Sequence, residues 1–134
     1  MATFEQYRAR REYLLIYAEL ITAARYRGVV TYQHLARLAG LPLKGSYMGK
    51  EIGMYLGAVS DAEHTLGRPL LSAVAISTKD TPGSGFFSIA KHLAKYSGGT
   101  REDERAFWLA EQEAVYEMWK PAFPEHVKGE VSSK

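Results

Sequence analysis

The side chains best suited to binding chemistry lie close together near the start of one predicted helix, residues 46–66. Four of them recur at about one-turn spacing: Ser46, Tyr47, Lys50 and Met54. The free N–H groups of a helix's first turn favour phosphate, and side chains of that turn reach base edges when a helix enters a DNA groove. With Lys44 just before them, they predict a nucleic-acid contact in which Lys44 and Lys50 bind phosphates.

A helix-turn-helix would position these residues. Thr31 is a good N-cap for a helix over residues 32–39, and Gly40 with nearby Pro42 ends it. Residues 45–60 then form the recognition helix. The apolar run 70–77 predicts a buried strand, and the glycine-containing turn 79–85 predicts the tip of a hairpin.

A hairpin in this place makes the predicted unit a winged helix-turn-helix. Lys79, at the base of the wing, and Arg37, on the first helix, are further predicted DNA contacts.

Long helices flank this unit on both sides. An amphipathic helix over residues 4–25 has its predicted buried stripe at Leu14, Tyr17, Ala18, Ile21 and Ala24. After a short helix over residues 88–96, a helix over residues 101–120 is capped by Thr100, and its predicted stripe is Phe107, Ala110, Ala114 and Met118. These outer helices are expected to cover the core or to form a dimer interface.

The prediction is therefore one mainly helical α+β domain over residues 1–134. Its parts are an N-terminal helix (1–27), the helix-turn-helix and wing (28–87), C-terminal helices (88–120) and a tail (121–134).

The recognition helix is unusual because Gly49, Gly53 and Gly57 share one of its faces. Each glycine in a helix interior costs about 1 kcal/mol relative to alanine. Something must therefore approach this face closely: another helix, a nucleic-acid backbone or a ligand. The opposite side, with Ile52, Leu56 and Val59, is expected to pack in the core, with Tyr55 at its edge.

Composition narrows the function classes. The 134 residues contain no cysteine, which excludes disulfides and thiol chemistry. The start of the chain lacks the apolar stretch of a signal peptide and no apolar run approaches ~20 residues, so a cytoplasmic protein without membrane contact is expected.

Residues 1–50 carry eight Lys/Arg against three Glu, and residues 51–134 carry nine against twelve acidic residues. This polarity either marks a basic binding face or reflects charges spread over solvent-facing helices.

Part of the chain resembles a known family. The segment V-T-Y-Q-H-L-A-R-L-A-G, the helix with small residues, the Pro-Leu-Leu entry to a strand and the Gly-x-Gly-aromatic exit are similar to the DNA-binding domain of O6-alkylguanine-DNA alkyltransferases and alkyltransferase-like proteins. The resemblance covers about residues 28–87 and implies a DNA-binding winged helix. The family's Pro-Cys-His-Arg motif is replaced here by Ser72-Ala73-Val74-Ala75, so alkyl transfer to a thiol is excluded. The place of the family's arginine finger falls near Lys50.

Other catalytic centres find no support in the sequence. The four histidines lack metal-ligand spacing, Ser72 lacks a nucleophile-elbow motif, and residues 78–85 lack the Lys-Ser/Thr ending of a phosphate-binding loop. No cofactor is expected. The sequence favours a non-enzymatic, regulatory protein that binds double-stranded DNA. The alternative is an adaptor for a protein or a small ligand, with its pocket beside the glycine face.

Overall fold

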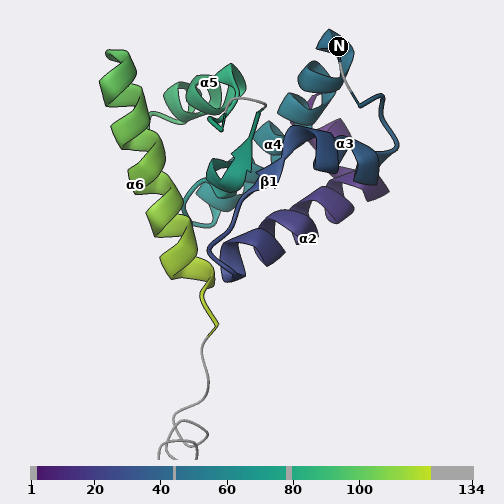
Figure 1. The fold of residues 1–134 in the computed structure, drawn as a ribbon, viewed down its shortest axis with the longest axis horizontal. Helices are drawn as coiled ribbons and strands as arrows, with labels where there is room; N and C mark the ends of the chain where they lie inside the picture. The colour runs from purple at the N-terminus through teal and green to yellow at the C-terminus, as the bar shows by residue number, and fades with distance from the viewer. Residues whose placement is uncertain (1–2, 44, 78–79, 122–134) are drawn as a thin grey trace, which may run out of the picture.

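The structure, a computed structural model, describes residues 3–43, 45–77 and 80–121 (Figure 1). Its helices are α1 (Phe4–Arg8), α2 (Arg11–Arg25), α3 (Tyr32–Ala39), α4 (Ser46–Thr65), the 3-10 helix η1 (Leu71–Val74), α5 (Ser84–His92) and α6 (Arg101–Trp119). Two short strands, β1 (Val30–Thr31) and β2 (Ala75–Ile76), pair in parallel. The predicted mainly helical α+β class is confirmed. Residues 122–134 of the predicted tail lie outside the described residues.

The predicted N-terminal helix is two helices. Thr3 caps α1 through a capping box with Gln6, the helix ends at Ala9, and Arg10 is extended with ψ 145°. This break lets α1 pack against α4 while α2 takes a new direction. The buried face of α2 consists of Tyr13, Ile16, Leu20 and Ala24.

The predicted stripe of α2 was wrong at two positions. Leu14 is 65% exposed and Ala18 is exposed, whereas Tyr17 and Ile21 are half-buried and Ala24 is buried. The stripe assumed one continuous helix, and the restart at Arg11 rotates the buried face by about one residue.

The parallel pair joins two distant segments. Val30 is opposite Ala75 and Thr31 is opposite Ile76. The predicted strand over residues 70–77 is buried from Leu70 to Ile76, but its first part coils into η1. A two-residue partner strand can satisfy only a short length of ladder, so the rest turns to make its own hydrogen bonds, such as Ala73 N–H to Leu70 O at 3.0 Å.

The helix pair α3 and α4 forms as predicted. The Thr31 hydroxyl accepts a hydrogen bond from His34 N–H at 3.1 Å, and Gly40 ends α3 in the left-handed conformation, φ 71°. Ile52, Leu56 and Val59 are buried. Tyr55, expected at the edge, is also buried, because its ring packs edge-on against Tyr7 of α1.

The predicted hairpin is not present in the described residues. After β2, Ser77 N–H donates to Thr81 O at 2.7 Å, and α5 begins at Ser84 rather than at residue 88. Phe86, Ile89 and Ala90 are spaced to bury one helical face, and this places Phe86 and Phe87 in a helix.

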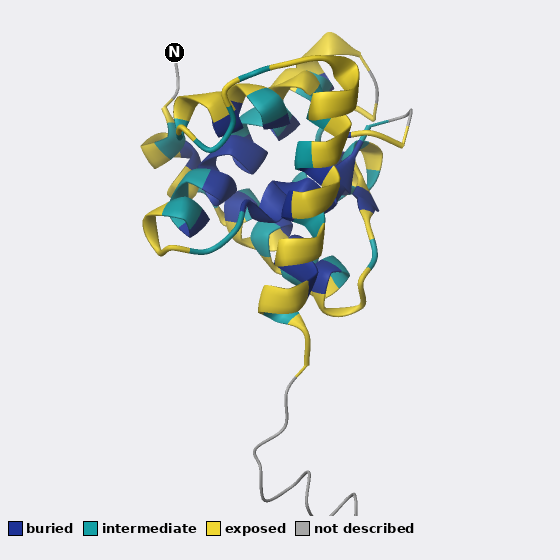
Figure 2. Cartoon of the chain, turned by 90° about the vertical axis from the view of Figure 1, so that its left-hand side faces the viewer, coloured by how far each residue is buried: buried dark blue, intermediate teal, exposed yellow. Residues whose placement is uncertain are grey.

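Helix α6 begins where predicted, behind the Thr100 cap, which forms a capping box with Asp103. Its buried residues are Trp108, Glu111, Val115 and Tyr116. Of the predicted stripe, Phe107 is half-buried, and Ala110, Ala114 and Met118 are exposed. Figure 2 shows that the helix leading into the tail is largely exposed on its outer side.

Hydrogen bonds from the side chains of α6 orient this helix. Trp108 Nε1 donates to Ala73 O and the Tyr116 hydroxyl donates to Gly28 O, both at 2.8 Å. Glu111 accepts from Leu70 N–H at 2.8 Å and from Lys95 Nζ at 2.5 Å. These groups must face η1 and the segment before β1, and the alanines therefore face solvent.

A buried carboxylate joins α2 to the end of α4. Glu63 is fully buried, and it accepts hydrogen bonds from Arg68 Nε at 2.6 Å, Arg68 Nη2 at 3.1 Å and the Tyr17 hydroxyl. A buried charge is stable only when paired and hydrogen-bonded, so this cluster fixes where α4 ends.

We expect Arg68→Ala to lower the free energy of unfolding by about 3 kcal/mol, because it leaves the Glu63 carboxylate buried without its cation. Urea denaturation followed by circular dichroism measures the loss. Arg27→Ala, which breaks an exposed ion pair with Glu113, is the matched control and should change stability much less. Equal losses in the two variants would contradict the assigned role of Glu63.

Stability should also fall at alkaline pH. Burial and the hydrogen bond to Glu63 raise the pKa of Tyr17, and burial with Glu51 raises the pKa of Tyr7 to about 12. Unfolded tyrosines ionise near pH ~10 while these folded ones stay protonated, so stability is full below that pH and is lost above it. Tyr17→Phe should show a shallower alkaline loss in unfolding titrations than wild type. The exposed Tyr26→Phe is the control, and an unchanged slope in Tyr17→Phe would contradict this expectation.

Candidate nucleic-acid interface

The predicted contact residues of α4 lie on one accessible part of the helix. Ser46, Tyr47 and Lys50 are exposed, with Tyr47 at 59%, and Met54 is half-buried. Arg37 is exposed in the last turn of α3. Lys44 and Lys79 lie outside the described residues.

The first turn of α4 is left open on one side and anchored on the other. Gly45, φ 102°, provides no side-chain cap, and Met48 and Ile52 hold the opposite side in the core. The neighbouring acid is turned away, because Glu51 accepts from the Tyr7 hydroxyl at 2.6 Å and lies 3.7 Å from Arg10 Nη1. Lys50 is therefore the charged group presented by these exposed turns.

The glycine face has two different environments. A Cβ added at Gly57 would lie 2.6 Å from Cζ of Phe4, so α1 covers this position. A Cβ at Gly49 or Gly53 would meet nothing within 4 Å. The predicted close approach of another helix is thus found at Gly57, and the remainder of the face is open.

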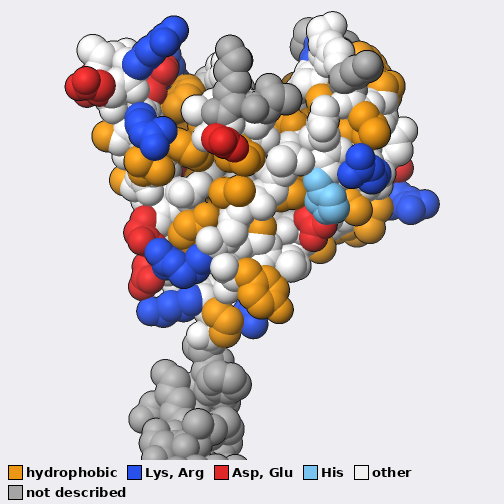
Figure 3. All heavy atoms as spheres, in the orientation of Figure 1, with side chains coloured by type: hydrophobic (Ala, Val, Ile, Leu, Met, Phe, Trp, Pro, Cys, Tyr) orange, Lys and Arg blue, Asp and Glu red, His pale blue; other side chains and the backbone are white. Residues whose placement is uncertain are grey.

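The open glycines line a cleft of about 670 Å³ between α4 and α5. Its walls also include Tyr32, Lys50 and Met54 on one side, and Ser84, Ser88 and His92 on the other. In Figure 3 the upper edge of the molecular surface is notched between these two parts. A hollow therefore lies beside the glycine face, and Lys50 and Met54 border it.

Tyr32 closes the base of the cleft. Its hydroxyl accepts a hydrogen bond from Gly83 N–H at 3.1 Å, and burial raises its pKa. A Cβ at Gly83 would lie 2.5 Å from that hydroxyl oxygen, so glycine is required for the contact. This bond sets the position of α5 relative to α3.

Reasoning from the sequence missed α5 as a wall of the cleft. The signal was present: Phe86, Ile89 and Ala90 have helical spacing, and Ser84-Gly85 precedes them. The prediction of a hairpin over the same residues concealed this helical pattern.

One histidine of the described residues lies within hydrogen-bond distance of a carboxylate. His34 Nε2 lies 2.5 Å from Glu19 Oε2, but no group of three His, Asp or Glu side chains in the described ranges has the arrangement of a metal site. No helix among those described is long and apolar enough to cross a bilayer.

Comparison of the chain with protein-family models, with curated proteins and with solved structures finds no match.

The open glycines make a direct prediction. Gly53→Ala should raise the free energy of unfolding by about 0.5–1 kcal/mol, because alanine is the better helix former and its methyl group has free space. Thermal and urea unfolding measure the gain. Gly57→Ala, whose methyl group must displace the Phe4 ring, is the control and should gain less or lose stability. A destabilised Gly53→Ala would show that the face is not open.

Proposed function

We propose that the protein binds double-stranded DNA without catalysing a reaction, with α3 and α4 acting as a helix-turn-helix and α4 as the recognition helix. The observation that carries the proposal is the division of α4. Its second half is buried in the core, whereas its first turns expose Ser46, Tyr47 and Lys50 beside an open cleft.

The exposed turns have the composition that DNA contact needs. Tyr47 and Ser46 offer hydroxyl groups for phosphates or base edges, and Lys50 offers the charge. Arg37 adds a second cation from α3. The glycines next to Lys50 let a nucleic-acid backbone approach the helix more closely than larger residues would.

In this proposal the unit is a variant of the winged helix. The segment of sequence between β2 and α5, which contains Lys79, takes the place of the wing. The resemblance of residues 28–87 to the DNA-binding domain of alkyltransferases and alkyltransferase-like proteins supports the same assignment, with Lys50 near the place of the family's arginine finger.

A second candidate is supported by the cleft itself. Its volume of about 670 Å³ and the free space above Gly49 and Gly53 suit a small ligand with a flat group. Binding of an uncharged ligand there would depend little on salt, and this separates the second candidate from DNA binding; loss of Lys50, which lines the cleft, would not separate them.

The test is a fluorescence-anisotropy titration of a labelled random-sequence duplex at low and moderate salt. Wild type should bind, and its affinity should fall linearly in log–log form with salt. Lys50→Ala should weaken binding and reduce the slope of log Kobs against log[salt] by about 0.9, the value for one phosphate contact. Tyr47→Phe should weaken binding with the slope unchanged.

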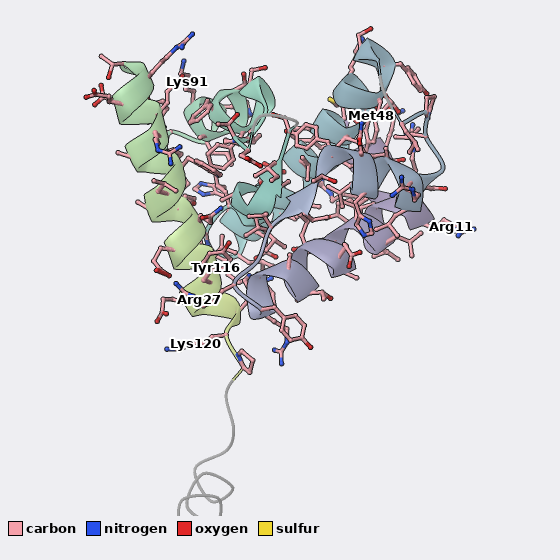
Figure 4. All side chains as sticks on the ribbon, in the orientation of Figure 1. Arg11, Arg27, Met48, Lys91, Tyr116 and Lys120 are labelled. Carbon is pink, nitrogen blue, oxygen red and sulfur yellow. The ribbon has the colours of Figure 1, made fainter. Side chains whose placement is uncertain are left out.

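Lys120→Ala is the matched control, because Lys120 follows α6 at the opposite end of the molecule from Met48 (Figure 4). Its affinity should equal that of wild type. Absence of duplex binding at low salt would contradict the proposal and favour the small ligand in the cleft. Equal weakening by Lys50→Ala and Lys120→Ala would show an unspecific charge effect and no defined interface.

A further inference from the structure

A second groove, of about 650 Å³, lies between α5 and the first turns of α6. Phe87 and Lys91 line it from α5, and Arg101, Arg105 and Trp108 line it from α6. Ser84 and Ser88 line both this groove and the α4–α5 cleft, so the two hollows are neighbours on either side of α5. We call it the α5–α6 groove.

The α5–α6 groove carries an excess of positive charge. Lys91, Arg101 and Arg105 are exposed, and within the described ranges none has a carboxylate oxygen within 4 Å of its charged nitrogens. Glu104 is the acidic residue that lines the groove. Its neighbour Asp103 turns its carboxylate to Thr100 N–H at 2.9 Å, and the pKa of Asp103 is lowered by that bond.

Three other basic residues of the described chain are held in ion pairs that the groove cations lack. Arg27 is bound to Glu113, Arg68 to Glu63 and Lys95 to Glu111. Arg101 and Arg105 are one turn apart, so both lie on the same side of α6. The guanidinium of Arg105 lies 5.9 Å from the centre of the Trp108 ring, which gives its stem an apolar support.

The groove lies toward the same end of the molecule as the first turns of the proposed recognition helix. Figure 4 shows Lys91 on α5 and Met48 on α4 at the same end of the molecule, and Arg27 and Lys120 at the opposite end. The first turns of α4 and the α5–α6 groove therefore lie toward the same end of the molecule, with α5 between them.

We infer that the α5–α6 groove binds the sugar-phosphate backbone of the same duplex, through Lys91, Arg101 and Arg105. The inference rests on the proposed DNA binding and adds a second contact region to it. Charge complementarity selects the occupant: the residues that line the groove carry three exposed cations and one carboxylate, and this suits a strand with a negative charge on every residue. Glu102 and Asp103 belong to the same turn of α6 but do not line the groove. The contact is independent of base sequence, so it adds affinity and fixes orientation.

The test compares two double variants that remove the same charge. Arg101→Gln/Arg105→Gln changes the groove and keeps part of each side-chain stem. Arg25→Gln/Lys120→Gln changes the last turn of α2 and the end of α6. Both are titrated with the labelled duplex over a range of salt, beside wild type, Lys91→Gln and Lys50→Ala. Thermal unfolding checks that each variant is folded.

We expect the groove variant to bind the duplex roughly tenfold more weakly at moderate salt and to lose about 2 from the salt slope, because two phosphate contacts are removed. For Lys91→Gln the salt slope should fall by about 1, since one phosphate contact is removed. The Arg25/Lys120 variant should match wild type.

Different failures point to different errors. If Lys50→Ala weakens binding and the groove variant does not, the inference is overturned and the proposed function stands. Equal weakening in both double variants overturns the inference as a general charge effect. If wild type fails to bind the duplex, both fall. If instead a labelled poly-glutamate peptide binds wild type and not the groove variant, the occupant is an acidic protein segment.

Discussion

The buried Glu63 carboxylate is the constraint on which the rest of this fold depends. It has no access to water, so it must receive its hydrogen bonds from Arg68 and Tyr17, and these come from beyond the end of α4 and from α2. One turn earlier, the buried Ser60 hydroxyl donates to Ser72 Oγ at 2.7 Å and ties α4 to η1. The second half of α4 is therefore fixed on several sides. Its first half extends away from these contacts, and this asymmetry makes one end of the helix available for binding.

The glycines of α4 follow the same division. At Gly57, in the fixed half, the absent side chain lets the Phe4 ring of α1 lie against the helix backbone. At Gly49 and Gly53, in the extended half, no part of the described chain occupies the space. The same residue type thus serves packing at one position and leaves a cleft at the others. A helix that tolerates the cost of glycine at open positions is held by its other contacts, chiefly Met48 and Ile52 in the core.

Local rules predicted the helices well and their orientations poorly. Thr31, Gly40 and Thr100 mark helix ends in the sequence and act so in the structure, because capping depends on neighbouring backbone groups. The buried faces of α2 and α6 were misjudged because long-range partners decide them. Trp108 and Tyr116 turn inward to reach the carbonyls of Ala73 and Gly28, and no periodicity of apolar residues contains that information. The exposure of Ser46, Tyr47 and Lys50 was predictable because it follows from the spacing of residues within α4. The α5 wall and the α5–α6 groove were not predictable, because they depend on how separate helices pack together.

The near-neutral net charge of +2 conceals how the charges are used. Sequence halves suggested a basic N-terminal part and an acidic C-terminal part, but the structure pairs charges across that boundary. Arg8 forms an ion pair with Asp61, Arg10 with Glu51, and Arg27 with both Glu113 and Glu117. Several acidic residues of the C-terminal part therefore form ion pairs between helices or between a helix and a neighbouring loop. Among the cations without such partners in the described ranges, Lys50, Lys91, Arg101 and Arg105 border the two hollows beside α5, whereas Arg11, Arg25 and Arg37 line neither. Position after folding, rather than position in the sequence, determines which charges can meet a polyanion.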